Sequence, residues 1–302
     1  MTVAELYVEN LDPASVVAVA RQRARVVMGE EARERVSASR GRVEIMIDGA
    51  RPVYGVTTGF GALANTRITA EKRLELQHSL LRSHAAGMGP FVEPEVVRAM
   101  MAIRAKTLSA GYSGVRPELI DALIAFLNAD LTPAVPEYGS MGASGDLAPL
   151  AHVGLCLVGE GRLLEHGEPV RTRDAMKRAG IRPFRLATKE GLALINGTDG
   201  MLAMLLLSLD DLRVLLKTAD VTAAMSVEAM LGTDRVFRED LHSLRAHPGQ
   251  LASAGNISNL LSGSPIVASH RDSPHLVQDA YSLRCAPRSS ARRATRSITP
   301  RS

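Results

Sequence analysis

Segments with helical periodicity, punctuated by proline and glycine, cover most of this sequence and constrain its fold more than any other feature. Residues 93–111 and 116–130 each begin beside a proline, and residues 14–29, 69–87 and 198–231 each end at or just before a glycine. Proline suits the first turn of a helix, and glycine suits its end. The chain is therefore expected to fold mainly as α-helices.

The composition agrees with a helical core. Aromatic residues make up 3% of the 302 residues and Trp is absent, so the core has to be built from Ala, Leu, Val and Met. These residues suit packed helices better than a β-sandwich. We expect a mainly α protein, in which a smaller mixed N-terminal region at 1–110 precedes a bundle of long helices at 111–287. Residues 159–170 are predicted to form a short β-hairpin that turns at His166 and Gly167.

Cysteine usage and the apolar runs indicate a location inside the cell. Cys156 and Cys285 lie far apart without a CxxC partner, and the N-terminus lacks the basic-then-apolar pattern of a signal peptide. We therefore expect a reduced, cytoplasmic protein. The longest strongly apolar run, residues 201–209, is too short to cross a bilayer, which takes about 20 residues in a helix. It is expected to be a buried helix, and no membrane partner is predicted.

The formal net charge of +4 is concentrated at the C-terminus. The last 15 residues contain no acidic residue and five arginines, which are Arg288, Arg292, Arg293, Arg296 and Arg301. The rest of the chain is close to neutral, so its charge gives no reason to propose a nucleic-acid partner. Residues 288–302 follow no hydrophobic period and are expected to be disordered.

The run GSMGASGDLAPLAH at residues 139–152 contains a tripeptide, Ala143-Ser144-Gly145, that can react with itself. Gly145 supplies an unhindered amide nitrogen, which can attack the carbonyl carbon of Ala143. Loss of the Ser144 hydroxyl as water then leaves an electrophilic five-membered ring. The same tripeptide is common in ordinary turns, so the surrounding sequence has to show whether this one is expected to cyclise. Asp146 is expected to shape this tight loop through a hydrogen bond rather than to catalyse.

Four further runs, taken with this one in chain order, supply that context. They are YGVTTGFG at 54–61, RSHAAGMGP at 82–90, KEGLALINGTDGM at 189–201 and VQDAYSLRCAP at 277–287. Together the five runs resemble the aromatic amino acid ammonia-lyases, and among these they are most similar to the histidine ammonia-lyases. The resemblance implies a 4-methylideneimidazol-5-one (MIO) group made from Ala143-Ser144-Gly145. It also implies elimination of ammonia from L-histidine to give trans-urocanate, the first step of histidine degradation.

The resemblance assigns roles to single residues. Tyr54 matches the base that removes the β-proton, in a glycine-rich loop that is expected to close over the substrate. His84 follows Ser83 in a pair that marks the members acting on histidine, and an imidazole can exchange hydrogen bonds with the substrate imidazole. Asn196 matches the residue that contacts the MIO ring and the substrate amine.

Three more residues are assigned near the end of the chain. Gln278 and Tyr281 match residues that line the site and orient the substrate and the MIO group. Arg284 matches the arginine that binds the substrate carboxylate through a bidentate, charge-assisted contact. The histidines are scattered, and HRDSPH at 270–275 is not a convincing ligand set, so no metal is predicted.

After Pro287 the sequence leaves the family pattern. Intact members are longer, form homotetramers and combine residues of several subunits in each active site. With a suitable choice of codons, the tail read one base earlier gives Gln-Val-Leu-Gly-Ala-Ala-Arg-Asp, which continues the pattern. We therefore hypothesise a single-base loss near Pro287, with 288–302 as a non-native tail on a truncated chain. Such a chain is expected to have little or no lyase activity, and its assembly as a tetramer is in question.

Two alternatives stay open. A tyrosine or phenylalanine ammonia-lyase, or an aminomutase, would use the same MIO group, although Ser83-His84 argues against these. The other is a helical protein without catalytic activity whose basic tail binds an anionic partner. Only the arginine cluster supports it, and deleting residues 288–302 would remove any such salt-sensitive binding.

Overall fold

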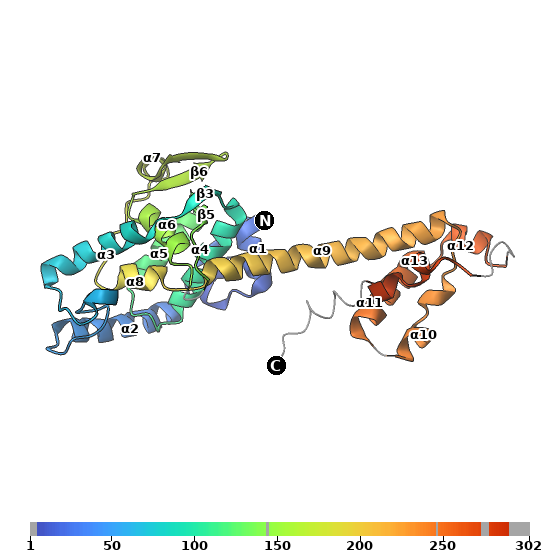
Figure 1. Ribbon diagram of the computed structural model, residues 1–302, viewed down its shortest axis with the longest axis horizontal. Coiled ribbons are helices and arrows are strands. Elements are labelled where there is room, and N and C mark those ends of the chain that lie inside the picture. The colour runs from blue at the N-terminus through green and yellow to red at the C-terminus, as the bar shows by residue number, and fades with distance from the viewer. Residues whose placement is uncertain (1–4, 143–144, 246, 273–277, 290–302) are drawn as a thin grey trace. The chain divides into compact units, whose positions relative to one another are not determined.

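The computed structural model describes residues 5–142, 145–245, 247–272 and 278–289 (Figure 1). The expectation of a mainly α fold is confirmed. The chain divides into two compact units, Met1–Leu207 and Ser208–Ser302. The boundary expected near residue 110 lies inside the first unit, between two helices that pack against each other.

The first unit is built mainly from helices. Those that begin in it are α1 (Pro13–Arg21), α2 (Glu30–Asp48), α3 (Ala70–His84), α4 (Pro94–Ser109), α5 (Pro117–Asn128), α6 (Leu147–Leu157), α7 (Thr172–Arg178), α8 (Glu190–Ile195) and α9 (Asp199–Ala229), with short 3-10 helices η1 (Val8–Asn10) and η2 (Gly61–Leu63). Helix α4 packs against α1, α2 and α5. Its Val97, Met101 and Leu108 are fully buried, so α4 forms the centre of the core.

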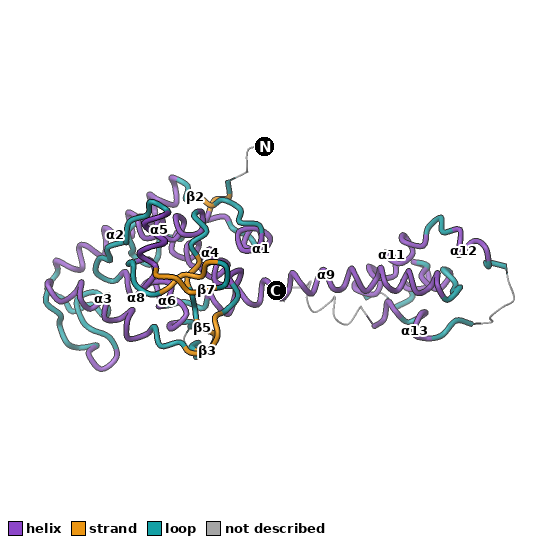
Figure 2. Tube along the Cα trace, turned by 90° about the horizontal axis from the view of Figure 1, so that it is seen from above, coloured by secondary structure: helices purple, strands orange, loops and turns teal. Residues whose placement is uncertain are grey.

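Short strands join the helices of this unit (Figure 2). The strands β1 (Leu6–Tyr7) and β2 (Val26–Val27) pair in parallel, and β3 (Met88–Phe91) pairs antiparallel with β5 (Pro136–Tyr138). A three-stranded sheet has the order β4 (Thr132–Pro133), β6 (Arg162–Glu165) and β7 (Glu168–Arg171). The predicted hairpin is β6–β7, with φ of 51° at His166 and 86° at Gly167 in the turn. That prediction is confirmed.

Two local expectations were wrong. The helix expected at 14–29 ends at Arg21, because Arg23 has a φ of 55° and the chain then enters β2. The apolar run at 201–209 lies in α9, but only Ala203 and Leu207 of it are buried within this chain, while most of its other large side chains are exposed.

The second unit has a smaller core of its own. Besides the rest of α9 it contains η3 (Arg235–Phe237), α10 (Glu239–Ser243), α11 (Pro248–Leu261), α12 (Pro265–Ser269) and α13 (Tyr281–Arg284). Its buried side chains include Val227, Phe237, Ile257, Leu261 and Val267. The core therefore joins α9, η3, α11 and α12.

Within the described ranges, one helical stretch is long and apolar enough to span a membrane by length and composition. Within Glu190–Ala229, an 18-residue window has a mean hydropathy of 1.6 and is 39% buried. A core helix of a soluble protein can meet the same criterion. The absence of a membrane partner thus stays a prediction.

Candidate functional site

The segment that was predicted to cyclise is described from Gly145 onward, while Ala143 and Ser144 lie outside the described residues. Gly145 has a φ of 122°, which L side chains rarely adopt. A Cβ on Gly145 would also overlap the carbonyl oxygen of Gly197 and lie 3.1 Å from its carbonyl carbon. Both the backbone conformation and this close approach therefore require glycine at position 145.

Asp146 fixes the loop after Gly145, as the sequence analysis expected. Its side chain is buried, with Oδ1 accepting a hydrogen bond from Ser140 Oγ at 2.7 Å and Oδ2 accepting one from the Met201 amide at 2.9 Å. Its own amide donates to the Gly197 carbonyl at 2.6 Å. The Asp146 carboxylate thus contacts the first turn of α9, where the helix dipole favours negative charge. Asp146 thus joins the loop to the start of α9.

Asn196 lies in the turn that contacts this loop. It ends α8, with its amide 3.2 Å from the carbonyl of Leu192, and its side chain is exposed. The next residue, Gly197, is the one that packs against Gly145. Asn196 therefore directly precedes the residue that contacts the loop, and its role beside an MIO group stays a prediction.

Tyr54 belongs to a loop that packs against α8, the helix that leads to Asn196. Its side chain is 59% exposed and meets the Phe60 ring edge to face, with the ring centroids 6.3 Å apart. The neighbouring Gly55 has a φ of 69°, and a Cβ there would lie 2.6 Å from Leu192 Cδ2 on α8. Thr57 and Thr58 are buried. The loop is thus anchored to α8, and its closure over a substrate stays a prediction.

His84 is the last residue of α3, and its side chain is half-buried. Its Nδ1 lies 2.9 Å from the Leu80 carbonyl and 3.0 Å from Ser83 Oγ. A carbonyl oxygen only accepts hydrogen bonds, so Nδ1 carries a proton. In the neutral imidazole, Nε2 is then an acceptor. The Ser83-His84 pair therefore orients the ring and sets its tautomer.

The segment after His84 lies beside the segment that precedes the tripeptide. Met88 of β3 pairs with Tyr138 of β5. A Cβ at Gly139 would lie 3.2 Å from the Gly87 Cα. The Gly87 amide donates to Nε2 of His152 on α6 at 3.2 Å, and burial lowers the pKa of His152. The motifs at 82–90 and 139–152 are therefore adjacent.

The three site residues predicted near the end of the chain lie in the second unit. Gln278 is exposed, Tyr281 begins α13 and is 71% exposed, and Arg284 ends α13 with a half-buried side chain. Nearby, Asp279 is buried and accepts a hydrogen bond from the Thr233 amide at 2.6 Å. The first unit thus holds Tyr54, His84, Gly145 and Asn196, and the second holds Gln278, Tyr281 and Arg284.

Sequence reasoning missed the buried charges that hold α8 in place. Glu190 is fully buried and accepts hydrogen bonds from the Arg116 amide, from Arg116 Nε and Nη2, and from the Ala187 amide, at 2.7–3.0 Å. The hydrogen bond to Glu190 raises the pKa of Arg116. Gln77 on α3 accepts from the Gly191 amide at 2.9 Å. Burial of these residues depends on contacts between distant segments, which local periodicity does not reveal.

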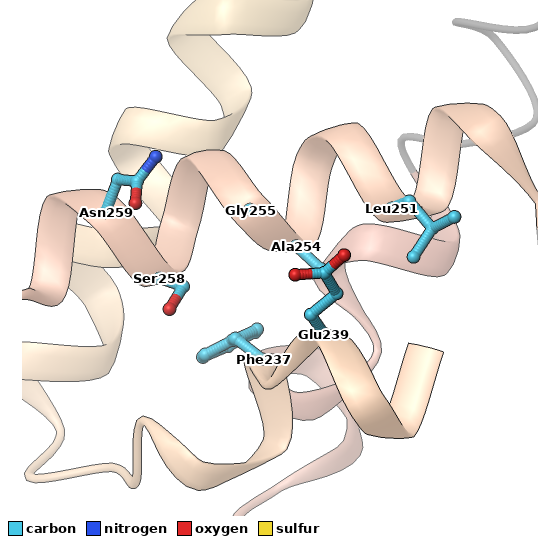
Figure 3. A pocket seen from close by; sticks show the side chains of 7 residues that line it. All are labelled: Phe237, Glu239, Leu251, Ala254, Gly255, Ser258 and Asn259. Carbon is cyan, nitrogen blue, oxygen red and sulfur yellow. The ribbon is translucent and has the colours of Figure 1, made fainter. Parts of the chain in front are cut away.

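A pocket of about 360 Å³ lies in the second unit between η3, α10 and α11 (Figure 3). Its lining residues are Phe237, Glu239, Leu251, Ala254, Gly255, Ser258 and Asn259, and they include none of the predicted site residues. Among the described residues, no three or more His, Cys, Asp or Glu side chains are grouped to hold a metal ion. A metal-free site stays a prediction.

The family model for aromatic amino acid lyases matches residues 11–294. The chain belongs to this family.

Two curated relatives with high sequence identity to this chain are histidine ammonia-lyases. The chain is 54% identical to histidine ammonia-lyase of Streptomyces avermitilis over 273 residues, which are 90% of this chain and 53% of that protein. It is 49% identical to the Symbiobacterium thermophilum histidine ammonia-lyase over 272 residues, again 90% of this chain and 53% of that protein. The chain spans about half the length of the curated relatives it matches.

Solved structures share the fold. Tyrosine aminomutase from Streptomyces globisporus superposes with a TM-score of 0.87 at 36% identity, covering 97% of this chain and 59% of that one. Histidine ammonia-lyase from Trypanosoma cruzi superposes with a TM-score of 0.82 at 34% identity, covering 95% of this chain and 53% of that one.

Proposed function

We propose that this chain is part of a histidine ammonia-lyase, which eliminates ammonia from L-histidine to give trans-urocanate. The observation that carries the proposal is the backbone contact between Gly145 and Gly197, fixed by the hydrogen bond from the Asp146 amide. It holds the end of an Ala-Ser-Gly tripeptide in a conformation that only glycine adopts readily. The 54% identity to a histidine ammonia-lyase supports the choice of substrate.

We propose that MIO forms from Ala143, Ser144 and Gly145. The group supplies an electrophile that takes up the substrate amine and makes it a better leaving group. The residues beside it fit such a ring, because Gly197 approaches Gly145 without an intervening side chain. The exposed Asn196 side chain follows α8 next to this contact and is proposed to hydrogen-bond to the amine.

Tyr54 is proposed to remove the β-proton. Its ring is exposed at the end of a loop that packs on α8, the helix that leads to Asn196. The Tyr54 oxygen is therefore available to a substrate bound near this turn. A general base has to reach the proton within hydrogen-bonding distance in the bound complex.

His84 is proposed to bind the substrate imidazole. The Leu80 carbonyl keeps the proton of the neutral ring on Nδ1, so Nε2 can accept the N–H of the substrate ring. Arg284 is proposed to bind the carboxylate, and its guanidinium suits a planar anion with two oxygens. Gln278 and Tyr281 are proposed to orient the substrate and the MIO group.

Assembly and location are proposed from the resemblance alone. We propose that the complete enzyme is a homotetramer in the cytoplasm without a metal ion. Cross-linking followed by mass measurement of the particles would test the number of subunits.

Intact mass tests the proposed prosthetic group. Ring closure with dehydration removes two waters, so the purified chain should weigh about 36 Da less than its sequence mass. Tandem mass spectrometry should place the loss at Ala143-Ser144-Gly145, and Ser144→Ala should abolish it. A folded chain with the full sequence mass would contradict the proposal.

A panel of amino acids tests the substrate. L-Histidine, L-tyrosine and L-phenylalanine are compared by ammonia release, with this chain and with a version that continues in the shifted reading frame. The continued version should prefer histidine, and His84→Phe should reduce that preference, whereas this chain should release little or no ammonia. An aminomutase is the alternative, since the tyrosine aminomutase fold is so similar. Formation of β-amino acids without net ammonia would favour it.

A further inference from the structure

A buried ion pair between Arg104 and Asp199 contacts the turn that contains Asn196. Arg104 on α4 is 2% exposed and Asp199, the first residue of α9, is 4% exposed. Arg104 Nη1 lies 3.0 Å from Asp199 Oδ2, and Arg104 Nη2 donates to the Ala193 carbonyl on α8. One guanidinium therefore binds the helix before the turn and the helix after it.

The backbone of the turn rests directly on this pair. A Cβ on Gly197 would overlap both Arg104 Nη1 and Asp199 Oδ2. On its other side Gly197 contacts Gly145, and its carbonyl accepts the hydrogen bond from the Asp146 amide at 2.6 Å. Contacts thus run from the ion pair through one glycine to the other, without an intervening side chain.

The pair is not arranged for maximal stability. Burying two charges has a desolvation cost that the attraction between them often only balances. Among the described residues, the buried Nε of Arg104 has no hydrogen-bond partner, and an unmet buried donor is unfavourable. The rigid guanidinium does fix two acceptors at set positions. This combination favours a positioning role.

We propose that Arg104 and Asp199 are positioning residues, which hold the 196–198 turn against Gly145 and Asp146 and thereby preset the backbone for ring formation. This inference rests on the proposed function. In the reaction, Gly145 N bonds to the carbonyl carbon of Ala143, whose oxygen leaves as water with the amide protons of Gly145 and Ser144. The Ser144 hydroxyl leaves as a second water with the Cα proton. The two dehydrations need no oxidant.

The test compares two buried arginines of the same helix. Arg98 on α4 is also 2% exposed, but it donates to the Val19 and Leu127 carbonyls and pairs with Asp130, far along the chain from the turn. Arg104→Lys and Asp199→Asn are compared with Arg98→Lys and Asp130→Asn in the 302-residue chain. Circular dichroism measures folding, and mass spectrometry follows the loss of two waters with time.

We expect Arg104→Lys and Asp199→Asn to slow the loss of water by about 10- to 100-fold, because a shift of about 1 Å in reacting groups has effects of this size. The Arg98 and Asp130 variants should lose water at the rate of the unaltered chain. Equal rates in all four variants, or equal slowing in all four, would overturn the inference. An unaltered chain that loses no water would overturn the proposed function as well, which distinguishes the two failures.

A second measurement is independent of the reaction. In a Ser144→Ala background, amide hydrogen exchange at Asp146 reports its hydrogen bond to Gly197. Arg104→Lys should speed this exchange, whereas Arg98→Lys should leave it unchanged. If Arg104→Lys lowers the helical content more than Arg98→Lys does, the Asp199→Asn variant replaces it as the test, both for the rate of water loss and for amide exchange at Asp146. Unchanged exchange at Asp146 in a folded Arg104→Lys or Asp199→Asn chain would contradict the positioning role.

Discussion

Gly145 and Gly197 meet backbone against backbone, and the Asp146 amide donates to the Gly197 carbonyl at 2.6 Å beside this contact. Two loops that are distant in the sequence are thereby fixed to each other by main-chain atoms. The stability of the first unit should therefore depend on this contact and on the buried residues around it.

Gly197→Ala should destabilise the first unit. The added methyl would overlap Arg104 Nη1 and Asp199 Oδ2, which are both buried. Overpacking of this kind lowers the free energy of unfolding by about 1–3 kcal/mol. Urea denaturation measures the change. Gly41→Ala is the control, because a Cβ there meets nothing within 4 Å, and in a helix interior it should raise stability by about 0.5–1 kcal/mol. Equal effects of the two changes would refute the packing argument.

Glu190→Gln should be strongly destabilising. The amide cannot replace a fully buried carboxylate that accepts from Arg116 and the Ala187 amide. Breaking a buried pair lowers stability by about 3–5 kcal/mol, and we expect the lower end because Arg116 is partly exposed. Glu165→Gln removes an ion pair on the surface and should change stability by about 0–1 kcal/mol. Denaturant titration of both variants tests the difference, and a similar loss in each would contradict it.

Cys156 should be unreactive in the folded protein and should make stability fall at alkaline pH. Burial raises its pKa from 9.0 to about 12. A raised folded-state pKa contributes stability that is complete below pH 9.0 and is lost as the pH rises toward about 12. Thiol labelling should therefore modify the half-buried Cys285 first, and Cys156 only on unfolding.

Cys156→Ala is the control for the pH effect. Its free energy of unfolding should fall less steeply above pH 9.0 than that of the unaltered chain. Rapid labelling of Cys156 under native conditions would show that the site is open to solvent.

His152 should make the first unit less stable in mild acid. Burial lowers its pKa below 6.5, and its Nε2 accepts a hydrogen bond from the Gly87 amide. A lowered folded-state pKa gives stability that is present above pH 6.5 and is lost as the pH falls toward the lower value. His152→Gln keeps an acceptor but does not titrate, so its unfolding free energy should change less over this range. Identical pH profiles for the two proteins would count against this role.

The sequence predicted the elements with strong local signals. Pro94 and Pro117 mark the starts of α4 and α5, and His166-Gly167 forms the hairpin turn, where φ is positive at both residues. The end of α1 was missed because β2 pairs with β1, about 20 residues earlier in the chain. Local periodicity contains no information about such pairing.

The candidate site was likewise predictable from the sequence only in part. The resemblance assigned Tyr54, His84, Gly145 and Asn196, and their roles stay predictions. In the first unit the loop of Tyr54 contacts α8, which leads to Asn196, and the turn after Asn196 contacts Gly145. The supporting charges were not predictable, because Arg104 or Glu190 on a helix is ordinarily expected to face solvent. Their burial follows from the packing of α4 and α8, which only the folded chain defines.

The paired glycines also have an evolutionary consequence. Position 145 cannot acquire a side chain while the Gly197 backbone keeps its place, and position 197 cannot acquire one while Arg104 and Asp199 keep theirs. Both glycines should therefore be retained together among relatives, and a lineage that loses either one has to rearrange this turn.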